Sequence, residues 1–199
     1  LMRLERYDEA SAASQSALML LEELSADQLI TTRIVAERMQ GLAHLSLERY
    51  NDAYDAFTRA HNLLSLNATA EIAGVLLALA KLYYYQGRLD ESYAYQKRAF
   101  DKAQQLQDIH LIGASLSGLG NLAEERGRLP VALQSYDDSL QIHRSLARVI
   151  PQATDLYRIG VVHLLTFNYA KAYEYFMDAD RFFGSVGKVN MLVQGYCGY

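Results

Sequence analysis

The sequence predicts an all-α protein, a right-handed superhelical solenoid in which antiparallel helix pairs follow one another along the chain. Three observations predict this class. Small residues recur at intervals of about forty residues, apolar residues follow the period of roughly 3.6 residues that is typical of helices, and only two prolines occur in 199 residues. Because proline clashes inside a helix and removes a hydrogen-bond donor, its scarcity fits long uninterrupted helices.

The repeat is defined by glycine, alanine or serine at three positions of each unit. Two helices approach to about 8 Å only where neither carries a bulky side chain, so these residues mark the helix crossings. They are Gly41, Ala80, Gly120 and Gly160 in the first helix of each pair, and Ala10, Ala53, Ser92, Ala132, Ala172 with Ala17, Ala60, Ala99, Ser139, Ala179 in the second. The larger side chains of Phe57, Tyr136 and Phe176 are expected to fill the space toward the next pair.

A short turn separates the two helices of each pair. Gly87 and Gly127 suit the left-handed residue that closes a helix, whereas Phe167 takes the equivalent position in the last pair. Asp90 and Pro130 then fit the start of the following helix, where proline lacks only an orphan donor and aspartate complements the helix dipole. An arginine recurs in these turns, where we expect it to cap helix carbonyls, at Arg6, Arg49, Arg88 and Arg128.

These features divide the chain, residues 1–199, into a single array. A second helix without its partner is expected over 1–24, and the first helix of a further pair is expected to start within 188–199. The complete pairs are predicted at 29–65, 70–107, 109–148 and 152–184. Since neither end of such an array carries a polar capping helix, we expect self-association through the uncapped ends.

The pattern resembles the tetratricopeptide repeat, with its Leu-Gly in the first helix, its turn glycine, and its Ala, aromatic and Ala in the second. The period of about forty residues rather than about 34 is similar to the long-helix variety of bacterial signalling regulators and of polarity and motor adaptors. The chain departs from the family pattern in its lack of tryptophan. The resemblance implies a concave groove, lined by first helices, that binds a protein or peptide.

Composition and motifs argue against other classes of function. A net charge of -4 lacks the basic excess of a nucleic-acid-binding protein. No apolar run reaches the roughly 18 residues that membrane insertion requires. The single cysteine, Cys197, has no evident base beside it, and no nucleophile motif or phosphate-binding glycine loop occurs. We therefore expect neither an enzyme active site nor a cofactor, and the compartment stays open with the cytoplasm favoured.

Histidines and acidic doublets are expected to be structural. No histidine pair has metal-ligand spacing, and His44 and His163 are expected to face the second helix of their own pair. The doublets Glu124-Glu125 and Asp137-Asp138 do not form paired acids, because neighbouring residues point about 100° apart on a helix. No metal site is predicted.

The candidate groove consists of first-helix residues counted from the small positions. They mix tyrosines and aliphatic residues with charged ones, and tyrosine offers apolar area and a hydroxyl at low entropic cost. The predicted lining is Arg38, Leu77, Lys81, Tyr84, Tyr85, Ser117, Asn121, Glu124, Glu125, Tyr157, Val161 and Leu164, with Leu42, Leu45 and Leu165 beside them. A clamp for a C-terminal carboxylate is disfavoured, because Leu77, Ser117 and Tyr157 stand where such clamps resemble one another in having lysine.

The sequence thus predicts a non-enzymatic scaffold that recognises a protein or peptide, as the regulatory or sensor segment of a larger bacterial signalling protein. In that hypothesis a ligand changes the curvature of the array and shifts the balance between two states of an output domain. A constitutive adaptor of the polarity or motor-cargo kind remains the first alternative. A sensor that captures a small molecule or a pheromone-like peptide remains the second.

Overall fold

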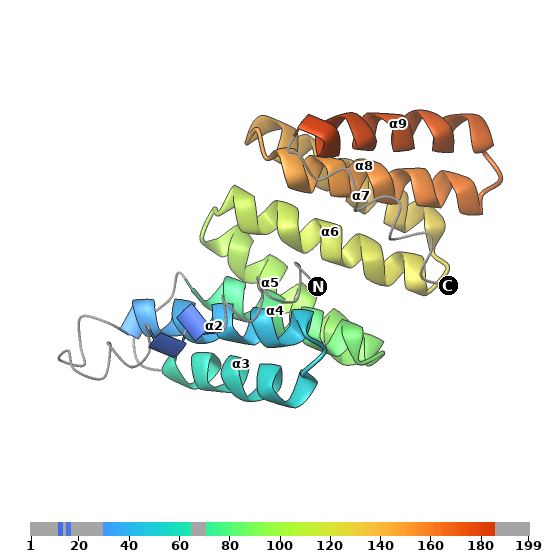
Figure 1. Cartoon of the computed structure of the whole chain (residues 1–199). Helices are drawn as coiled ribbons and strands as arrows, with labels where there is room; N and C mark the ends of the chain where they lie inside the picture. Colours follow the sequence, from blue (N-terminus) through green and yellow to red (C-terminus); the bar gives the residue numbers. More distant parts are fainter. Residues whose placement is uncertain (1–11, 14, 17–29, 65–70, 186–199) are drawn as a thin grey trace. The chain divides into compact units, whose positions relative to one another are not determined.

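The computed structural model describes residues 12–13, 15–16, 30–64 and 71–185. The expected helix at 1–24, apart from four of its residues, and the expected helix start at 188–199 lie outside this part of the chain. Within it, the regular elements are α-helices that form the predicted pairs (Figure 1). The predicted all-α solenoid fold is confirmed. Two compact units are distinguished, one up to Gln107 and one from Asp108 onward, and each is described by itself.

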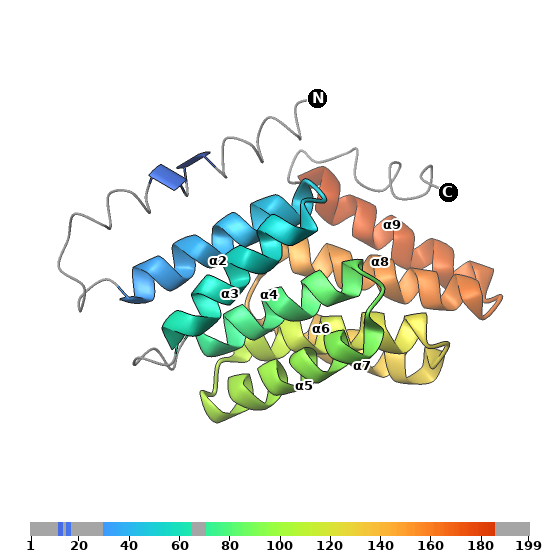
Figure 2. The same cartoon turned by 90° about the horizontal axis from the view of Figure 1, so that it is seen from below.

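Unit 1 contains two helix pairs. The first is α2 (Ile30–Ser46) with α3 (Tyr50–Leu64), and the second is α4 (Ile72–Tyr85) with α5 (Leu89–Gln105). The helices of each pair pack along each other, and α3 packs on α4 to join the pairs (Figure 2). Ile34, Phe57 and Leu82 are completely buried in the core between them.

Unit 2 repeats this arrangement. Its pairs are α6 (Ile109–Glu125) with α7 (Leu129–Ser145), and α8 (Val149–Leu165) with α9 (Tyr169–Ser185). The pairs are joined by packing of α7 on α8. Tyr136, Leu156 and Ile159 are buried in the core of this unit. The second helices α3, α5, α7 and α9 begin 39, 40 and 40 residues apart, which confirms the long period.

The small residues lie at the helix crossings, as predicted. Ala53, Ala132 and Ala179 are buried on second helices, and Ala80 is buried on a first helix. Ser92 is also buried, and its hydroxyl donates to the carbonyl of Ala80 at 2.8 Å, so its polar atom is satisfied inside the crossing. A larger side chain at these positions would separate the helices of its pair.

The aromatic side chains of the second helices each lie against the glycine of their own pair. Phe57 and Tyr136 also belong to the buried cores that contain first-helix residues of the next pair, in line with the prediction. A Cβ built on Gly120 would lie 2.5 Å from Cε1 of Tyr136, and one built on Gly160 would lie 2.6 Å from Cε1 of Phe176. Phe57 occupies the same place beside Gly41. The glycines are therefore needed because an aromatic ring covers them.

The turns share one backbone geometry. Gly87 has φ 72° and Gly127 has φ 67°, which confirms the predicted left-handed closing residue, and Phe167 adopts the same conformation with φ 59°. After Gly87, the N–H of Arg88 donates to the carbonyl of Tyr83 at 2.9 Å, the bond that defines a Schellman motif. The geometry is thus imposed by the helix end and is accepted even by a bulky residue.

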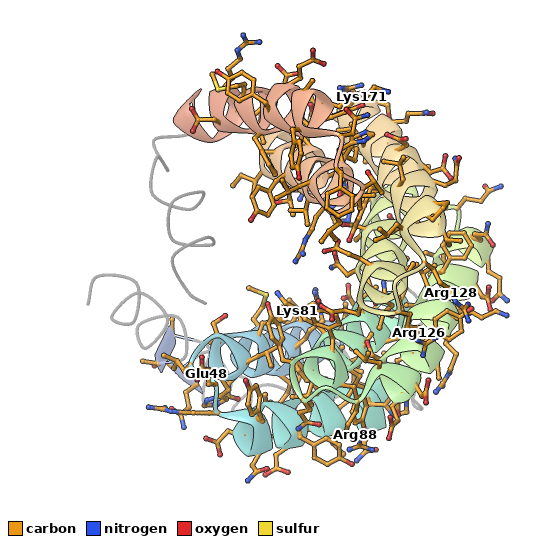
Figure 3. All side chains as sticks on the ribbon, turned by 90° about the vertical axis from the view of Figure 1, so that its right-hand side faces the viewer. Glu48, Lys81, Arg88, Arg126, Arg128 and Lys171 are labelled. Atoms are coloured by element: carbon orange, nitrogen blue, oxygen red, sulfur yellow. The ribbon has the colours of Figure 1, made fainter. Side chains whose placement is uncertain are left out.

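The Arg88 side chain, in the turn between α4 and α5, does not cap carbonyls, contrary to expectation. The Arg88 side chain is labelled in Figure 3. Its guanidinium donates to Glu91 at 2.7 and 2.9 Å and lies 4.5 Å from the centre of the Tyr83 ring. The backbone N–H of Arg88, rather than its side chain, satisfies the helix end. Its side chain pins the start of α5 to the end of α4.

Replacing Ala147 by glycine is expected to raise the free energy of unfolding by about 0.5–1 kcal/mol. Ala147 has φ 51°, and the left-handed conformation costs an L-residue about 1–2 kcal/mol, which exceeds the entropic cost of glycine. Urea denaturation measures the change. Gly127→Ala is the reverse control: nothing lies within 4 Å of its added Cβ, so a loss of stability there isolates the backbone term. A destabilised Ala147→Gly variant contradicts the argument.

Candidate functional site

The first-helix face of unit 1 combines cations with tyrosines. Lys81 is exposed, and its Nζ lies 5.9 Å from the centre of the Tyr85 ring, whose side chain is 52% exposed. Tyr84 and Tyr85 pack edge to face with ring centres 5.8 Å apart. Leu77 is half-buried on the same helix. Together they form an exposed aromatic and cationic surface on α4.

Residues of α2 contribute less of this face than predicted. Arg38 is half-buried and pairs with Glu71 at 3.6 Å, where Gly74 leaves room for its guanidinium. Leu42 packs against the core of unit 1, and Leu45 is only 5% exposed within that core. The placement of Leu45 in the groove is therefore wrong, because it belongs to the face of α2 that packs against α3 and α4.

The first-helix face of unit 2 is organised by hydrogen bonds around Tyr136. The Tyr136 hydroxyl lies 2.7 Å from Oε2 of Glu124 and 2.8 Å from the side-chain amide of Asn121. One hydroxyl proton serves one acceptor well, and a carboxylate is the stronger acceptor. Tyr136 therefore donates mainly to Glu124, and Oδ1 of Asn121 is the second acceptor within reach of the same hydroxyl. Asn121 and Glu124 are held in fixed positions.

Arg158, which the sequence analysis did not single out, joins this network. Its Nη1 lies 3.5 Å from Oε1 of Glu124 across α6 and α8. Burial is the main cause that raises the pKa of Tyr157; Glu124 raises it further, whereas Arg158 lowers it. The Tyr157 ring packs on Phe176 with centres 5.5 Å apart. Polar side chains of both first helices thus converge on one surface of unit 2.

The other predicted residues of unit 2 differ in exposure. Glu125 is exposed, Leu165 is 49% exposed, and Val161 and Leu164 are half-buried. Ser117 is half-buried and donates its hydroxyl proton to Oδ1 of Asp155 at 2.9 Å. Ser117 therefore connects this face with the interior of the unit.

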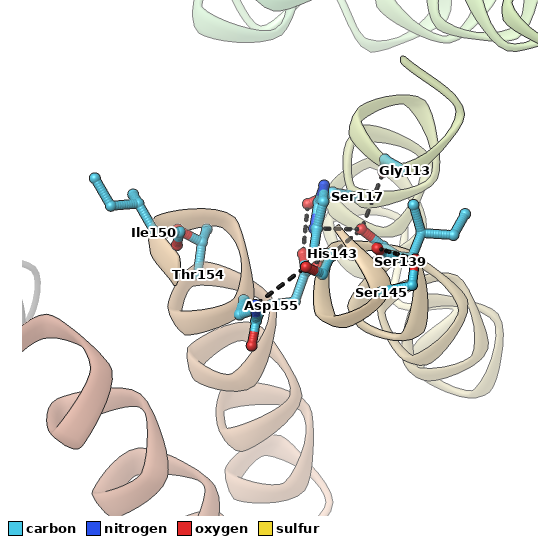
Figure 4. Close-up of polar contacts among 10 residues, drawn as sticks. Gly113, Ser117, Ser139, His143, Ser145, Ile150, Thr154 and Asp155 are labelled. Atoms are coloured by element: carbon cyan, nitrogen blue, oxygen red, sulfur yellow. Dashed lines mark hydrogen bonds and ion pairs between the residues drawn. The ribbon is translucent and has the colours of Figure 1, made fainter. Parts of the chain in front are cut away.

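A buried polar cluster lies behind Ser117, where α7 packs on α8. Asp155 is fully buried, and its Oδ2 lies 2.7 Å from Nδ1 of His143 and 2.8 Å from the hydroxyl of Ser139 (Figure 4). Gln152 donates to the backbone carbonyl of His143 at 3.0 Å. We call Ser117, Ser139, His143 and Asp155 the polar cluster. It could not be predicted from the sequence, because its members lie on three helices and share no local motif.

The polar cluster contains serine, histidine and aspartate but lacks the geometry of an activated nucleophile. An ionised carboxylate only accepts, so Nδ1 of His143 carries the proton that it shares with Asp155. That nitrogen then has no lone pair for Ser139, whose hydroxyl lies 3.3 Å from it and donates to Asp155 instead. A triad needs the serine and the acid on different ring nitrogens. The cluster is therefore structural.

Histidines lie where packing rather than metal chemistry explains them. His163 stacks on Tyr175 of α9 with ring centres 5.4 Å apart, so it faces the second helix of its own pair as predicted. In the described residues no three His, Cys, Asp or Glu side chains are grouped so that they could hold a metal ion. None of the described helices combines the length and apolarity needed to cross a bilayer.

The free energy of unfolding is expected to fall as the pH drops below about 6.5. Burial lowers the pKa of His110 and His163, and nearby Arg148 and Lys171, respectively, lower them further. The unfolded chain then binds protons at a higher pH than the folded chain, so stability is complete above the ordinary histidine pKa and decreases until the folded pKa is passed.

Urea denaturation between pH 7.5 and pH 5.5 tests this expectation. The double variant His110→Gln, His163→Gln should show a flatter dependence on pH, whatever its stability at pH 7.5. An equal slope in the variant and in the unaltered chain would contradict this origin of the acid sensitivity.

Comparisons with known proteins agree with this fold. Residues 71–145 match the family model described as tetratricopeptide repeat. Among solved structures, BtubC (BKLC) from P. vanneervenii superposes with a TM-score of 0.70 at 15% identity, over 92% of this chain and 75% of that chain. Aspartyl phosphate phosphatase F from Bacillus subtilis gives 0.71 at 12%, over 82% of this chain and 43% of that one. No curated protein sequence matches significantly.

A third similar structure is a Rap protein complexed with competence and sporulation factor. Its TM-score is 0.69 at 18% identity, over 93% of this chain and 63% of that chain. This chain therefore spans less than two thirds of the Rap protein and of the phosphatase. At such identities the likeness shows the fold. The tetratricopeptide repeat model thus matches residues 71–145, and the fold of the described chain is that of tetratricopeptide-like helical repeats.

Proposed function

We propose that this chain is a non-enzymatic scaffold that binds a protein or peptide on the first-helix faces of its repeats. The observation that carries the proposal is the surface of α4, where exposed Lys81 and Tyr85 and half-buried Tyr84 form an aromatic and cationic group. Tyrosine and arginine are enriched where protein interfaces concentrate binding energy, because they bury large areas at low entropic cost. The tetratricopeptide fold supports the same role.

Unit 2 offers a surface of different chemistry for the same role. The Tyr136 hydroxyl holds both Asn121 and Glu124, and Glu124 also pairs with Arg158. A ligand that binds there therefore meets donors and acceptors that are already oriented. Glu125 and Leu165 are exposed at the end of the two first helices. This pre-organisation favours recognition of a defined segment over non-specific adhesion.

We further propose that the scaffold acts as the regulatory or sensor segment of a bacterial signalling protein. Its support is the structural likeness to aspartyl phosphate phosphatase F and to the Rap protein that is complexed with competence and sporulation factor. The constitutive adaptor and the small-molecule or pheromone-peptide sensor remain alternatives. The domain composition of the full-length protein separates the signalling segment from the constitutive adaptor. A ligand-induced rise in melting temperature reveals the small-molecule or pheromone-peptide sensor.

Capture of partners from native lysate tests the recognition surface. The chain is compared with a Lys81→Glu, Tyr85→Ala variant and with a matched Tyr93→Ala, Lys97→Glu variant on the second helix of the same pair, where Tyr93 is 42% exposed. A parallel Glu125→Lys, Leu165→Ala variant tests unit 2. Variants of equal melting temperature are used, so that loss of fold cannot mimic loss of binding.

We expect a partner that the first-helix variants lose, at least tenfold, and that the Tyr93→Ala, Lys97→Glu variant keeps. A partner that the second-helix variant alone loses would place recognition on the other surface and contradict the proposal. The two double variants of unit 1 each remove one tyrosine side chain and reverse the charge of one lysine. The comparison between them therefore isolates the effect of position.

A further inference from the structure

The two junctions between consecutive repeats, one inside each unit, have opposite chemistry. In unit 1, α3 meets α4 through apolar side chains, with Ala60 and Val75 fully buried. Two repeat periods later along the chain, the equivalent positions of unit 2 are Ser139 and Asp155, also fully buried. Leu64 is likewise matched by His143. The same fold thus joins its repeats once by packing alone and once by a buried carboxylate.

The carboxylate constrains the position of the α8–α9 pair on the α6–α7 pair. Asp155 accepts from Ser117 on α6 and from Ser139 and His143 on α7, at 2.7 to 2.9 Å. Hydrogen bonds weaken steeply with distance and angle, and a buried ionised group that loses a donor is costly. An apolar junction allows its helices to slide slightly past each other, whereas the hydrogen bonds of Asp155 are all made in a single arrangement of the helices. The α7–α8 junction therefore has discrete states.

We propose that the Ser117–Asp155 hydrogen bond is a conformational catch. While it is made, the α8–α9 pair is held in one position on the α6–α7 pair; when the Ser117 proton is taken by another acceptor, Asp155 loses one of its three donors and the α7–α8 junction loosens. Ser139 cannot compensate, because its only proton is already shared between Asp155 and the carbonyl of Gly113, 3.0 Å away (Figure 4).

One of the two residues of the catch, Ser117, is accessible from the surface. Ser117 is half-buried on the first-helix face of unit 2, whereas Asp155, Ser139 and His143 are 0 to 3% exposed. A ligand carbonyl or carboxylate on this face that accepts from Ser117 therefore releases the junction, and by linkage an open junction binds such a ligand more tightly. Release of the junction by a ligand rests on the proposed function, whereas the Ser117–Asp155 catch is independent of it.

Amide hydrogen exchange of the whole chain, without ligand, tests the catch. Three variants are compared with the unaltered chain: Ser117→Ala removes the hydroxyl, Ser117→Thr keeps it, and Ser145→Ala removes a serine of the same helix pair whose hydroxyl bonds only the carbonyl of Ile142. In Ser117→Ala we expect exchange of the α7 and α8 amides beside the cluster to accelerate together by about tenfold, the size of one charge-assisted hydrogen bond.

The pattern of exchange decides the outcome. Ser117→Thr and Ser145→Ala should keep the protection of the unaltered chain, and the α9 amides should change in none of the variants, since no residue of α9 belongs to the polar cluster. Acceleration confined to α6 around position 117, or equal in Ser117→Ala and Ser145→Ala, would overturn the catch. Because no ligand is present, failure here leaves the proposed recognition function standing, and failure of partner capture leaves the catch standing.

Discussion

Replacing Asp155 by valine alone is expected to lower the free energy of unfolding by about 3–5 kcal/mol. The substitution removes the common acceptor of three donors: the buried N–H of His143 loses the carboxylate, and Ser139 keeps only the carbonyl of Gly113. Each buried donor that loses its partner costs about 1–3 kcal/mol. Valine itself fits a junction of this kind, as Val75 does at the equivalent position of unit 1.

The triple variant Ser139→Ala, His143→Leu, Asp155→Val is expected to recover most of this loss. It gives unit 2 the side chains that unit 1 carries at Ala60, Leu64 and Val75, and a buried ion pair replaced by packed apolar residues is often neutral or stabilising. Urea denaturation of both variants gives the two free energies. A triple variant as unstable as Asp155→Val would show that the loss comes from packing rather than from orphaned donors.

Replacing Gly120 by alanine is expected to cost about 1–3 kcal/mol, although alanine is the better helix former. The added Cβ would lie 2.5 Å from Cε1 of Tyr136. That ring is fully buried, and its hydroxyl is fixed at Asn121 and Glu124, so it cannot give way without breaking the network on the first-helix face. Chemical denaturation measures the cost.

A control variant and a double variant test the cause of this loss. Gly184→Ala, with nothing within 4 Å of its added Cβ, should leave stability unchanged or slightly higher. Tyr136→Leu removes the obstructing ring, so Gly120→Ala should cost much less in its presence, a non-additivity expected of residues in contact. Additive losses in the double variant would contradict a steric origin.

The sequence predicts the helix pairs because close helix crossings restrict composition strongly. Small residues at Gly41, Ala80, Gly120 and Gly160 can be recognised without coordinates, and so can the left-handed turn at Gly127. The contact between the Tyr136 ring and Gly120 could not be predicted, because the repeat fixes the residue's position on its helix but leaves its χ1 rotamer open. Phe167 could not be predicted as left-handed, because the helix end rather than its own preference imposes that conformation.

The candidate site divides in the same way. Exposure of Tyr85 and Lys81 follows from their place on the first helix, and it is predictable from the period. Arg158 and Asp155 act through contacts with α6 and α7, separated from them by tens of residues, and nothing local marks them. A serine and a histidine at positions otherwise held by Ala60 and Leu64 were the available signal, since polar residues at a buried helix junction require partners.

Photo-crosslinking from single positions tests most directly whether the first-helix faces recognise a protein. A photoreactive phenylalanine analogue is placed at Tyr85 or Leu165 on first helices, and at Tyr93 or Val131 on second helices, all four being 42 to 55% exposed. The account predicts that a protein or peptide adduct forms in native lysate from the first-helix positions and not from the second-helix positions. Adducts confined to Tyr93 and Val131 would contradict it.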